Sequence, residues 1–208
     1  MVFGIVIWVV DRPSRQLHVA ALYKFDNELL IGDLQWHHRA SCTNATPKNN
    51  AFWIAPALNN VDQRILAGTL HAWIEKNGSS IPYSVAHPGG MVFRDNVWVG
   101  NEPGQGLTCA TFIAELFKEL GLPFIDVDTW EKRSEDNEWA ERILGLLASS
   151  MDPKQVEAQR IRIGESIRVR PADVAAAGLL LTEDMETSMT FTQIAPTAKC
   201  IEEKLLSE

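Results

Sequence analysis

The chain has 208 residues, of which 46% are apolar and 22% are charged, and its formal net charge is -8. This composition suits one decorated domain or two small ones, and it excludes compositional disorder. The acidic charge argues against a nucleic-acid partner, because neutralising phosphates requires a basic surface.

The cysteines and the N-terminus suggest where the protein resides. Cys42, Cys109 and Cys200 are widely spaced and odd in number, which indicates a reducing compartment rather than a disulfide framework. The apolar run from Met1 to Val10 has no basic leader and no small-residue cleavage site, and it is too short to span a bilayer. We therefore expect a cytoplasmic protein without a membrane span. Export by a route without an N-terminal signal is the alternative.

The first half of the chain predicts strands, then a helix. Residues 1–10 are typical of a strand buried on both faces. Residues 17–25 and 28–37 flank the turn signal Asp26-Asn27, which predicts a β-hairpin. Polar residues 41–50 predict a loop. Further elements are a short apolar run at 52–54, an amphipathic helix at 60–76, and strands at 90–93 and 97–99.

The second half begins with the helix that Cys109 opens, at 109–120, and continues with an acidic helix up to about residue 147. Residues 160–163 and 166–170 look like strands, and Pro171 is placed to open a short helix. The tail to Glu208 is expected to be an extended piece and a short helix. Together these elements predict a mixed α+β fold in which an antiparallel sheet packs on the helix of Cys109.

Cys109 is the most informative residue. It follows a loop with Gly104 and Gly106 and opens a helix whose apolar residues recur at helical spacing. A cysteine in the first turn feels the positive end of the helix dipole, which favours the thiolate. The alternative is a buried and inert cysteine, so a catalytic role requires a base nearby.

The histidines are the candidate bases. His71 belongs to the flank of a helix, and His87 lies in a loop where we expect it to be solvated. His37 and His38 are adjacent on a strand, so at most one of them faces any given site. His18 begins a strand with apolar neighbours that would hold a neutral imidazole in place. Taken alone, the pattern favours a hydrogen-bonded histidine at a strand end over a catalytic role for His18.

The order of these residues resembles a known family. A histidine heads a strand, a Tyr-x-x-Asp-Asn hairpin follows, and a cysteine opens a helix after a long gap. This order is similar to the circularly permuted branch of the papain-like (NlpC-type) cysteine hydrolases, in particular bacterial members related to lecithin:retinol acyltransferase. Residues 17–23 match the histidine strand and 107–113 the cysteine helix, and Pro82-Tyr83-Ser84 resembles a segment of bacterial members. The resemblance covers about residues 1–145.

The resemblance implies a permuted papain-like sheet or small barrel in residues 1–150, with 151–208 as an extension of unknown role packed on the same domain. It implies a hydrolase of the amidase, peptidase or acyl-transfer type, with Cys109 as nucleophile and His18 as base. The residue that orients the imidazole would come from the next strand. Asp33 is our choice, because a carboxylate in an apolar strand needs a partner, and His37 is the alternative.

Two further residues complete the expected site. The oxyanion would meet the backbone N–H of Cys109 and the side chain of Tyr83. Trp36, next to the histidine pair, would line the cleft. The bond attacked would be an amide or a thioester in a small-molecule, peptide or acyl substrate.

We expect no metal and no cofactor. The acidic run from Asp126 to Glu138 lacks the glycine and the spacing of a calcium loop, and the histidine pair with Cys42 lacks a second pair of zinc ligands. The alternative to an enzyme is a catalytically silent member of the same fold that serves as a binding module, with its acidic surface facing a protein partner. The presence of both Cys109 and His18 in the family order favours the enzyme.

Overall fold

The computed structural model describes residues 2–46, 50–87, 89–90 and 92–207. Met1 and Met91 of two expected strands, residues 47–49 of the expected loop and Glu208 of the tail lie outside the described residues.

A five-stranded antiparallel sheet with the strand order β4-β3-β2-β1-β5 forms one layer. Its strands are β1 (Phe3–Asp11), β2 (Gln16–Phe25), β3 (Glu28–Trp36), β4 (Arg39–Asn44) and β5 (Ala51–Ile54). A separate two-stranded sheet pairs β6 (Phe93–Arg94) with β7 (Val97–Trp98). The hairpin expected from the sequence is formed by β2 and β3, and the mixed α+β class with an antiparallel sheet is confirmed.

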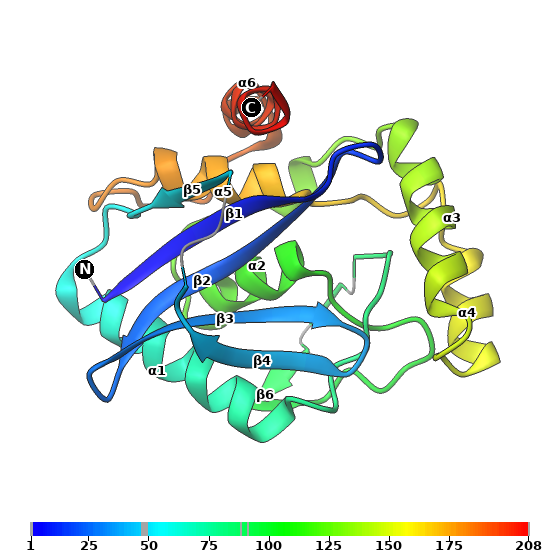
Figure 1. The fold of residues 1–208 in the computed structure, drawn as a ribbon, viewed down its shortest axis with the longest axis horizontal. Coiled ribbons are helices and arrows are strands. Elements are labelled where there is room, and N and C mark those ends of the chain that lie inside the picture. Colours follow the sequence, from blue (N-terminus) through cyan, green and yellow to red (C-terminus); the bar gives the residue numbers. More distant parts are fainter. Residues whose placement is uncertain (1, 47–49, 88, 91, 208) are drawn as a thin grey trace.

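Helices cover one face of this sheet (Figure 1). The described residues form the helices α1 (Asn60–Asn77), α2 (Cys109–Glu119), α3 (Glu135–Leu147), α4 (Pro153–Arg160), α5 (Pro171–Leu180) and α6 (Phe191–Ser207), with a 3-10 turn at Val127–Thr129. In Figure 1, α1, α2 and α5 lie behind the sheet, and α3 and α4 stand at one end of it. Among the described residues, no helix is long and apolar enough to cross a membrane.

The strands β2 and β3 separate part of the way along their length, and this separation positions the site. They pair from Phe25 with Glu28 as far as Ala21 with Gly32. Beyond that point β2 continues on β1, while β3 continues on β4. The helix α2 packs on both strands and is seen between their ribbons in Figure 1. The end of α2 can therefore approach backbone groups of β2 that a neighbouring strand would otherwise occupy.

The segment after residue 151 belongs to the same hydrophobic core as the sheet. The alanines Ala175, Ala176 and Ala177 of α5 are fully buried in a cluster that includes β1 and β2. The approach of α5 to β1 is close, because a Cβ at Gly178 would lie 2.6 Å from the Ile5 Cδ1 atom. The helix α6 then packs on α5 and β1.

Four of the sequence-based predictions of secondary structure were wrong. In the strand expected at 90–93, the described residues Gly90 and Val92 lie outside β6, which begins at Phe93. Residues 41–44 of the loop expected at 41–50 belong to β4, because a tight turn with His38 at a positive φ of 56° returns the chain onto β3. Residues 161–166 form turns and not strands, and the residues after them are irregular. The tail, expected to end in a short helix, forms the 17-residue helix α6, whose buried Ile194, Ala198, Ile201 and Leu205 recur at helical spacing.

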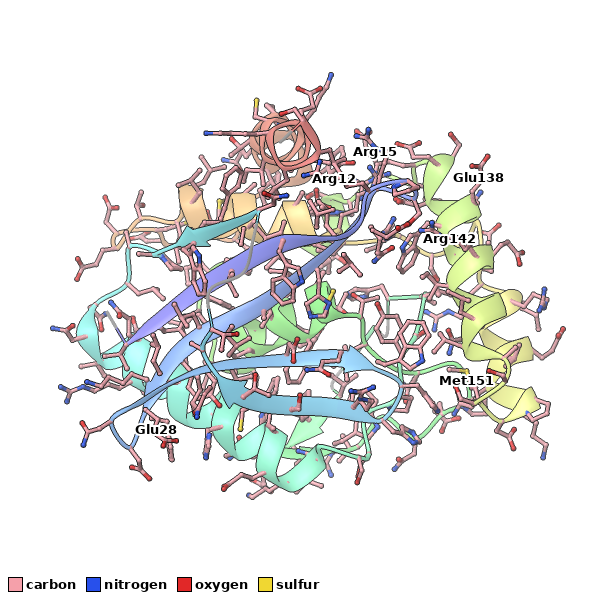
Figure 2. The ribbon with its side chains drawn as sticks, viewed as in Figure 1. Arg12, Arg15, Glu28, Glu138, Arg142 and Met151 are labelled. Carbon is pink, nitrogen blue, oxygen red and sulfur yellow. The ribbon has the colours of Figure 1, made fainter. Side chains whose placement is uncertain are left out.

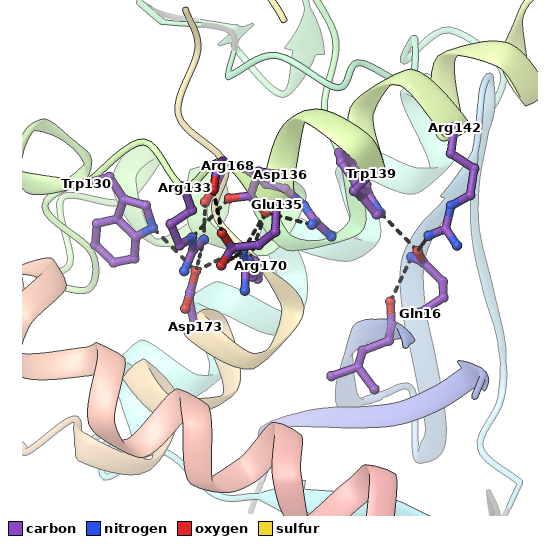
Figure 3. A network of polar contacts seen from close by, with 12 residues as sticks. Gln16, Trp130, Arg133, Glu135, Asp136, Trp139, Arg142, Arg168, Arg170 and Asp173 are labelled. Atoms are coloured by element: carbon purple, nitrogen blue, oxygen red, sulfur yellow. Dashed lines mark hydrogen bonds and ion pairs between the residues drawn. The ribbon is translucent and has the colours of Figure 1, made fainter. Parts of the chain in front are cut away.

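An ion-pair network ties the segment around residue 170 to α3 (Figure 3). The Asp136 carboxylate accepts hydrogen bonds from Arg133 Nε at 3.0 Å, Arg168 Nη1 at 2.9 Å and Arg170 Nε at 2.9 Å. Asp173, at the start of α5, accepts from Arg133 Nη2 at 3.2 Å and from the Arg170 backbone N–H at 2.8 Å. Burial opposes the charge of Asp136, but the three guanidinium groups lower its pKa. The alternation of arginine and apolar residues at 166–170 therefore places Arg168 and Arg170 for ion pairs with Asp136 and does not form a strand.

Removal of the Asp136 carboxylate is expected to destabilise the fold strongly. Asp136→Ala leaves Arg168 and Arg170 without their common partner, and we expect a loss of about 3 kcal/mol in the free energy of unfolding. Urea denaturation of the wild type and the variant measures this difference in the free energy of unfolding. Glu141→Ala is the control on the same helix, because the ion pair of Glu141 with Arg160 is about half exposed and should contribute less than about 1 kcal/mol. Equal losses in the two variants would contradict a structural role of the network.

Candidate active site

Cys109 is the first residue of α2, and a capping box sets its position. The Thr108 hydroxyl accepts from the Thr111 backbone N–H at 3.1 Å, and the Thr111 hydroxyl accepts from the Thr108 backbone N–H at 2.7 Å. The buried side chains of Phe112, Ile113, Leu116 and Phe117 anchor the helix in the core. The sulfur is thus held at the positive end of the helix dipole, with 3% of Cys109 exposed.

His18 and Asp33 face the same side of the sheet. Leu22 pairs with Ile31, and side chains an even number of positions further along each strand share their face. His18 is four positions from Leu22, and Asp33 is two positions from Ile31. His18 Nε2 lies 2.8 Å from Asp33 Oδ2, and the two side chains are 13% and 5% exposed. The structure therefore brings Asp33, and not the alternative residue, to the imidazole of His18.

The thiol of Cys109 hydrogen-bonds to the His18 ring, and the backbone of Val19 also hydrogen-bonds to the sulfur. Since Asp33 occupies Nε2, the other ring nitrogen, Nδ1, faces the thiol. Burial disfavours charge on both groups, but each charge stabilises the other. As a result, the pKa of His18 is raised to about 10 and the pKa of Cys109 is lowered. Both shifts favour the thiolate–imidazolium form of the pair over the neutral form.

Two tryptophans border the site. The ring of Trp8 lies 4.7 Å from the ring of His18, centroid to centroid, and the ring of Trp36 lies 5.2 Å from that of Tyr83. Trp36 therefore lies beside the expected oxyanion residue. Sequence reasoning missed Trp8, although its alternation with Val6 and Val10 along β1 places all three on the face of His18.

Tyr83 reaches the start of α2. Its backbone forms a parallel bridge with Leu107, and its hydroxyl hydrogen-bonds to the Cys109 backbone. Burial and the nearby Cys109 raise the pKa of Tyr83, so the phenol keeps its proton. His37 contacts Tyr83 rather than His18: its Nδ1 accepts from the Tyr83 backbone N–H at 3.2 Å.

His87 corrects an expectation from the sequence. Its side chain was expected to be solvated but is 13% exposed, with its Nε2 4.0 Å from Glu115 Oε1. Burial, with the nearby Lys118 and Arg162, lowers the pKa of His87 to about 4. His87 is therefore neutral near neutral pH and lies apart from the Cys109–His18 pair.

The structure contains a cleft of about 780 Å³. It lies between the turn from β1 to β2, the start of α3 and the helix α6, and its lining includes Leu17, Trp139, Arg168 and charged residues of both signs. Figure 2 labels three of these, Arg15, Glu138 and Arg142. The nucleophile is not among the lining residues. Two of the lining residues lie next to residues of the site. Arg168 interacts with Tyr83, and Leu17 precedes His18 in β2, although the Leu17 side chain packs in the core on the opposite face of the sheet.

Among the residues that the structure describes, no group of three or more histidine, cysteine or acidic side chains could hold a metal ion. Neither a protein-family model, nor a curated protein, nor a solved structure matches the chain. The function is therefore inferred from the geometry of the site.

The ion pair predicts an unusual pH dependence for alkylation by iodoacetamide. In a Cys42→Ser, Cys200→Ser background, we expect the rate at pH 6 to stay close to the rate at pH 8, because His18 keeps Cys109 ionised. In the additional His18→Ala variant the thiol should titrate more normally, and the rate should fall by about 10²-fold from pH 8 to pH 6. The reactive form is lost as pH falls through the lowered pKa of Cys109. A parallel fall in both proteins would contradict the ion pair.

Proposed function

We propose that the protein is a cysteine hydrolase of the amidase, peptidase or acyl-transfer type, which uses Cys109, His18 and Asp33 on an amide or thioester bond. The observation that carries the proposal is the hydrogen-bonded series from the Cys109 thiol through the His18 ring to the Asp33 carboxylate. The pKa shifts of Cys109 and His18 favour the reactive ionic form of the pair. Perturbed groups of this kind cluster at functional sites.

In the proposed acylation step, the Cys109 thiolate attacks the carbonyl carbon of the substrate and forms a tetrahedral oxyanion. The oxyanion receives hydrogen bonds from the Cys109 backbone N–H and from the Tyr83 hydroxyl, which turns from accepting to donating. The imidazolium of His18 then gives its proton to the leaving group as the carbonyl–leaving-group bond breaks. A thioester between the acyl group and Cys109 remains.

In the proposed second step, the neutral His18 takes a proton from water or from an acceptor nucleophile, which attacks the thioester. The Cys109–acyl bond breaks, the thiolate leaves, and the ion pair is restored. Asp33 keeps the imidazole in the orientation that presents Nδ1 to the sulfur and stabilises its charged form.

The order of the chain supports a permuted papain-like arrangement as the finer assignment of the fold. The histidine strand precedes the cysteine helix in sequence, and the helix packs on the histidine strand and its neighbour. This agrees with the resemblance of residues 17–23 and 107–113 to the circularly permuted branch of the family.

Turnover of a panel of amides, esters and thioesters with matched acyl groups tests the function. We expect release of the leaving group from at least one of these classes by the wild type and none by Cys109→Ala. No turnover of any class, together with ordinary reactivity of the Cys109 thiol, would favour a catalytically silent binding module.

A further inference from the structure

Two side chains from distant parts of the sequence hold the backbone of Tyr83. His37 Nδ1, at the turn between β3 and β4, accepts from the Tyr83 N–H at 3.2 Å. Gln159 Nε2, on α4, donates to the Tyr83 carbonyl at 3.1 Å, and Gln159 Oε1 accepts from the Val85 N–H at 3.0 Å. Gln159 therefore binds residues 83–85 at two points, as the edge of a neighbouring strand would.

The other side of the Tyr83 segment is bound to the chain that leads into α2. The Leu107 backbone N–H donates to the Pro82 carbonyl at 2.9 Å, and the Ser84 N–H donates to the Leu107 carbonyl at 3.1 Å. The segment is thus fixed between Leu107 and Gln159. The position of the Tyr83 hydroxyl at the Cys109 amide therefore depends on the hydrogen bonds with Leu107 and on those with Gln159.

We propose that Gln159 is a positioning residue for the Tyr83 hydroxyl, so that the segment after residue 151 completes the oxyanion side of the active site. The inference rests on the proposed function and gives the C-terminal segment a role in it. Sequence alone assigned this segment no role, and its resemblance to the family ends before α4.

The burial of Gln159 makes its hydrogen bonds to residues 83–85 costly to lose. Gln159 is 0% exposed, and both ends of its amide are used by the backbone of residues 83–85. A buried amide retains this arrangement because an unpaired polar group in the interior is costly. His37 is equally suited to hold the Tyr83 N–H, because burial and the neighbouring His38 lower the pKa of His37 and leave its Nδ1 free to accept.

A second residue of the same segment acts on the side chain of Tyr83. The Arg168 guanidinium opposes the rise in the Tyr83 pKa that burial and Cys109 cause. Arg168 is itself fixed, because its guanidinium carbon lies 3.5 Å from the centroid of the Trp139 ring and its Nη1 bonds to Asp136. Both ends of Tyr83, backbone and hydroxyl, are thus influenced by residues beyond 151.

Two reactions of the same sulfur separate positioning from general structural support. Alkylation by iodoacetamide requires the thiolate but forms no oxyanion. Acylation by p-nitrophenyl acetate requires the thiolate and also forms a tetrahedral oxyanion, which Tyr83 would stabilise. A residue that acts through Tyr83 should therefore affect acylation alone.

The test compares both rates in the full-length chain with Cys42→Ser and Cys200→Ser. We expect Tyr83→Phe to slow acylation by about 10²-fold, which is the effect typical of losing one hydrogen-bond donor to an oxyanion. Gln159→Ala should slow it by about 10-fold or more through misplacement of the hydroxyl. Alkylation should be unchanged in both. Gln63→Ala is the matched control, because Gln63 also binds backbone at both ends, at Val2 and Leu58, on α1; both of its rates should equal those of the wild type.

A conservative variant guards against misfolding of Gln159→Ala. In Gln159→Glu the carboxylate still accepts from Val85 but cannot donate to the Tyr83 carbonyl until it is protonated. The ratio of its acylation rate to that of Gln159→Ala at the same pH should therefore rise as pH falls.

The outcomes distinguish the positioning role of Gln159 from the proposed function of the protein as a cysteine hydrolase. Wild-type acylation at Cys109 with equally fast acylation of Gln159→Ala would overturn the positioning role and leave the enzyme proposal intact. Equal slowing of alkylation and acylation would also overturn it, because the role would then be structural. If the wild-type Cys109 is neither acylated nor reactive at low pH, both proposals fail.

Discussion

Replacement of Cys109 by alanine is expected to lower the turnover of any donor that the wild type accepts by about 10⁴-fold or more. The reason is that the variant has no sulfur to attack the carbonyl carbon, and His18 loses the negative charge that stabilises its proton. The change removes a single atom from a side chain that is 3% exposed, so the fold should persist. Initial rates across the donor panel measure the effect.

The control for this variant is Cys200→Ala, because Cys200 is an exposed thiol on α6. Its turnover should equal that of the wild type. Thermal unfolding of all three proteins shows whether the fold is retained. Substantial turnover by a folded Cys109→Ala protein would mean that another residue is the nucleophile.

Replacement of Asp33 by asparagine is expected to lower turnover by about 10²-fold or more, because the amide no longer holds the correct imidazole tautomer or stabilises its charge. It should also move the upper limb of the pH profile to lower pH. The Asp33 charge raises the pKa of His18, so its removal lowers the pH at which the imidazolium loses its proton. Stability and the pH profile of alkylation are measured alongside turnover.

Asp26→Asn provides the same chemical change at an exposed position of the β2–β3 turn. The positive φ of 44° at Asp26 is one that asparagine also tolerates, so this control should behave as the wild type. If Asp33→Asn also behaves as the wild type, the site operates as a Cys–His dyad and Asp33 has only a structural role.

Local patterns predicted the part of the site that depends on one element at a time. The glycine loop and the apolar spacing after Cys109 identified the start of α2, because a helix start is encoded within a few residues. The alternation along β3 placed Asp33 on one of two faces. The contact of Asp33 with His18, however, also depends on the separation of β2 from β3 beyond Gly32. No local pattern in the sequence predicts this separation.

Features that depend on distant segments could not be predicted in this way. Gln159 lies in a polar stretch whose pattern indicates a solvated helix, and its burial arises only from the docking of α4 on residues 83–85. The pattern around Arg168 has the alternation of a strand, but its arginines are spaced to reach Asp136. The partners are far apart in sequence: Gln159 is 74 residues from Val85, and Arg168 and Arg170 are 32 and 34 residues from Asp136.

The most direct test of the central claim is the mass of the protein after rapid quenching with a thioester or activated-ester donor, followed by peptide mapping. We predict one added acyl group on the peptide that contains Cys109, and its absence in Cys109→Ala. An acyl group on Cys42, on Cys200 or on a lysine, with none on Cys109, would contradict the proposed nucleophile.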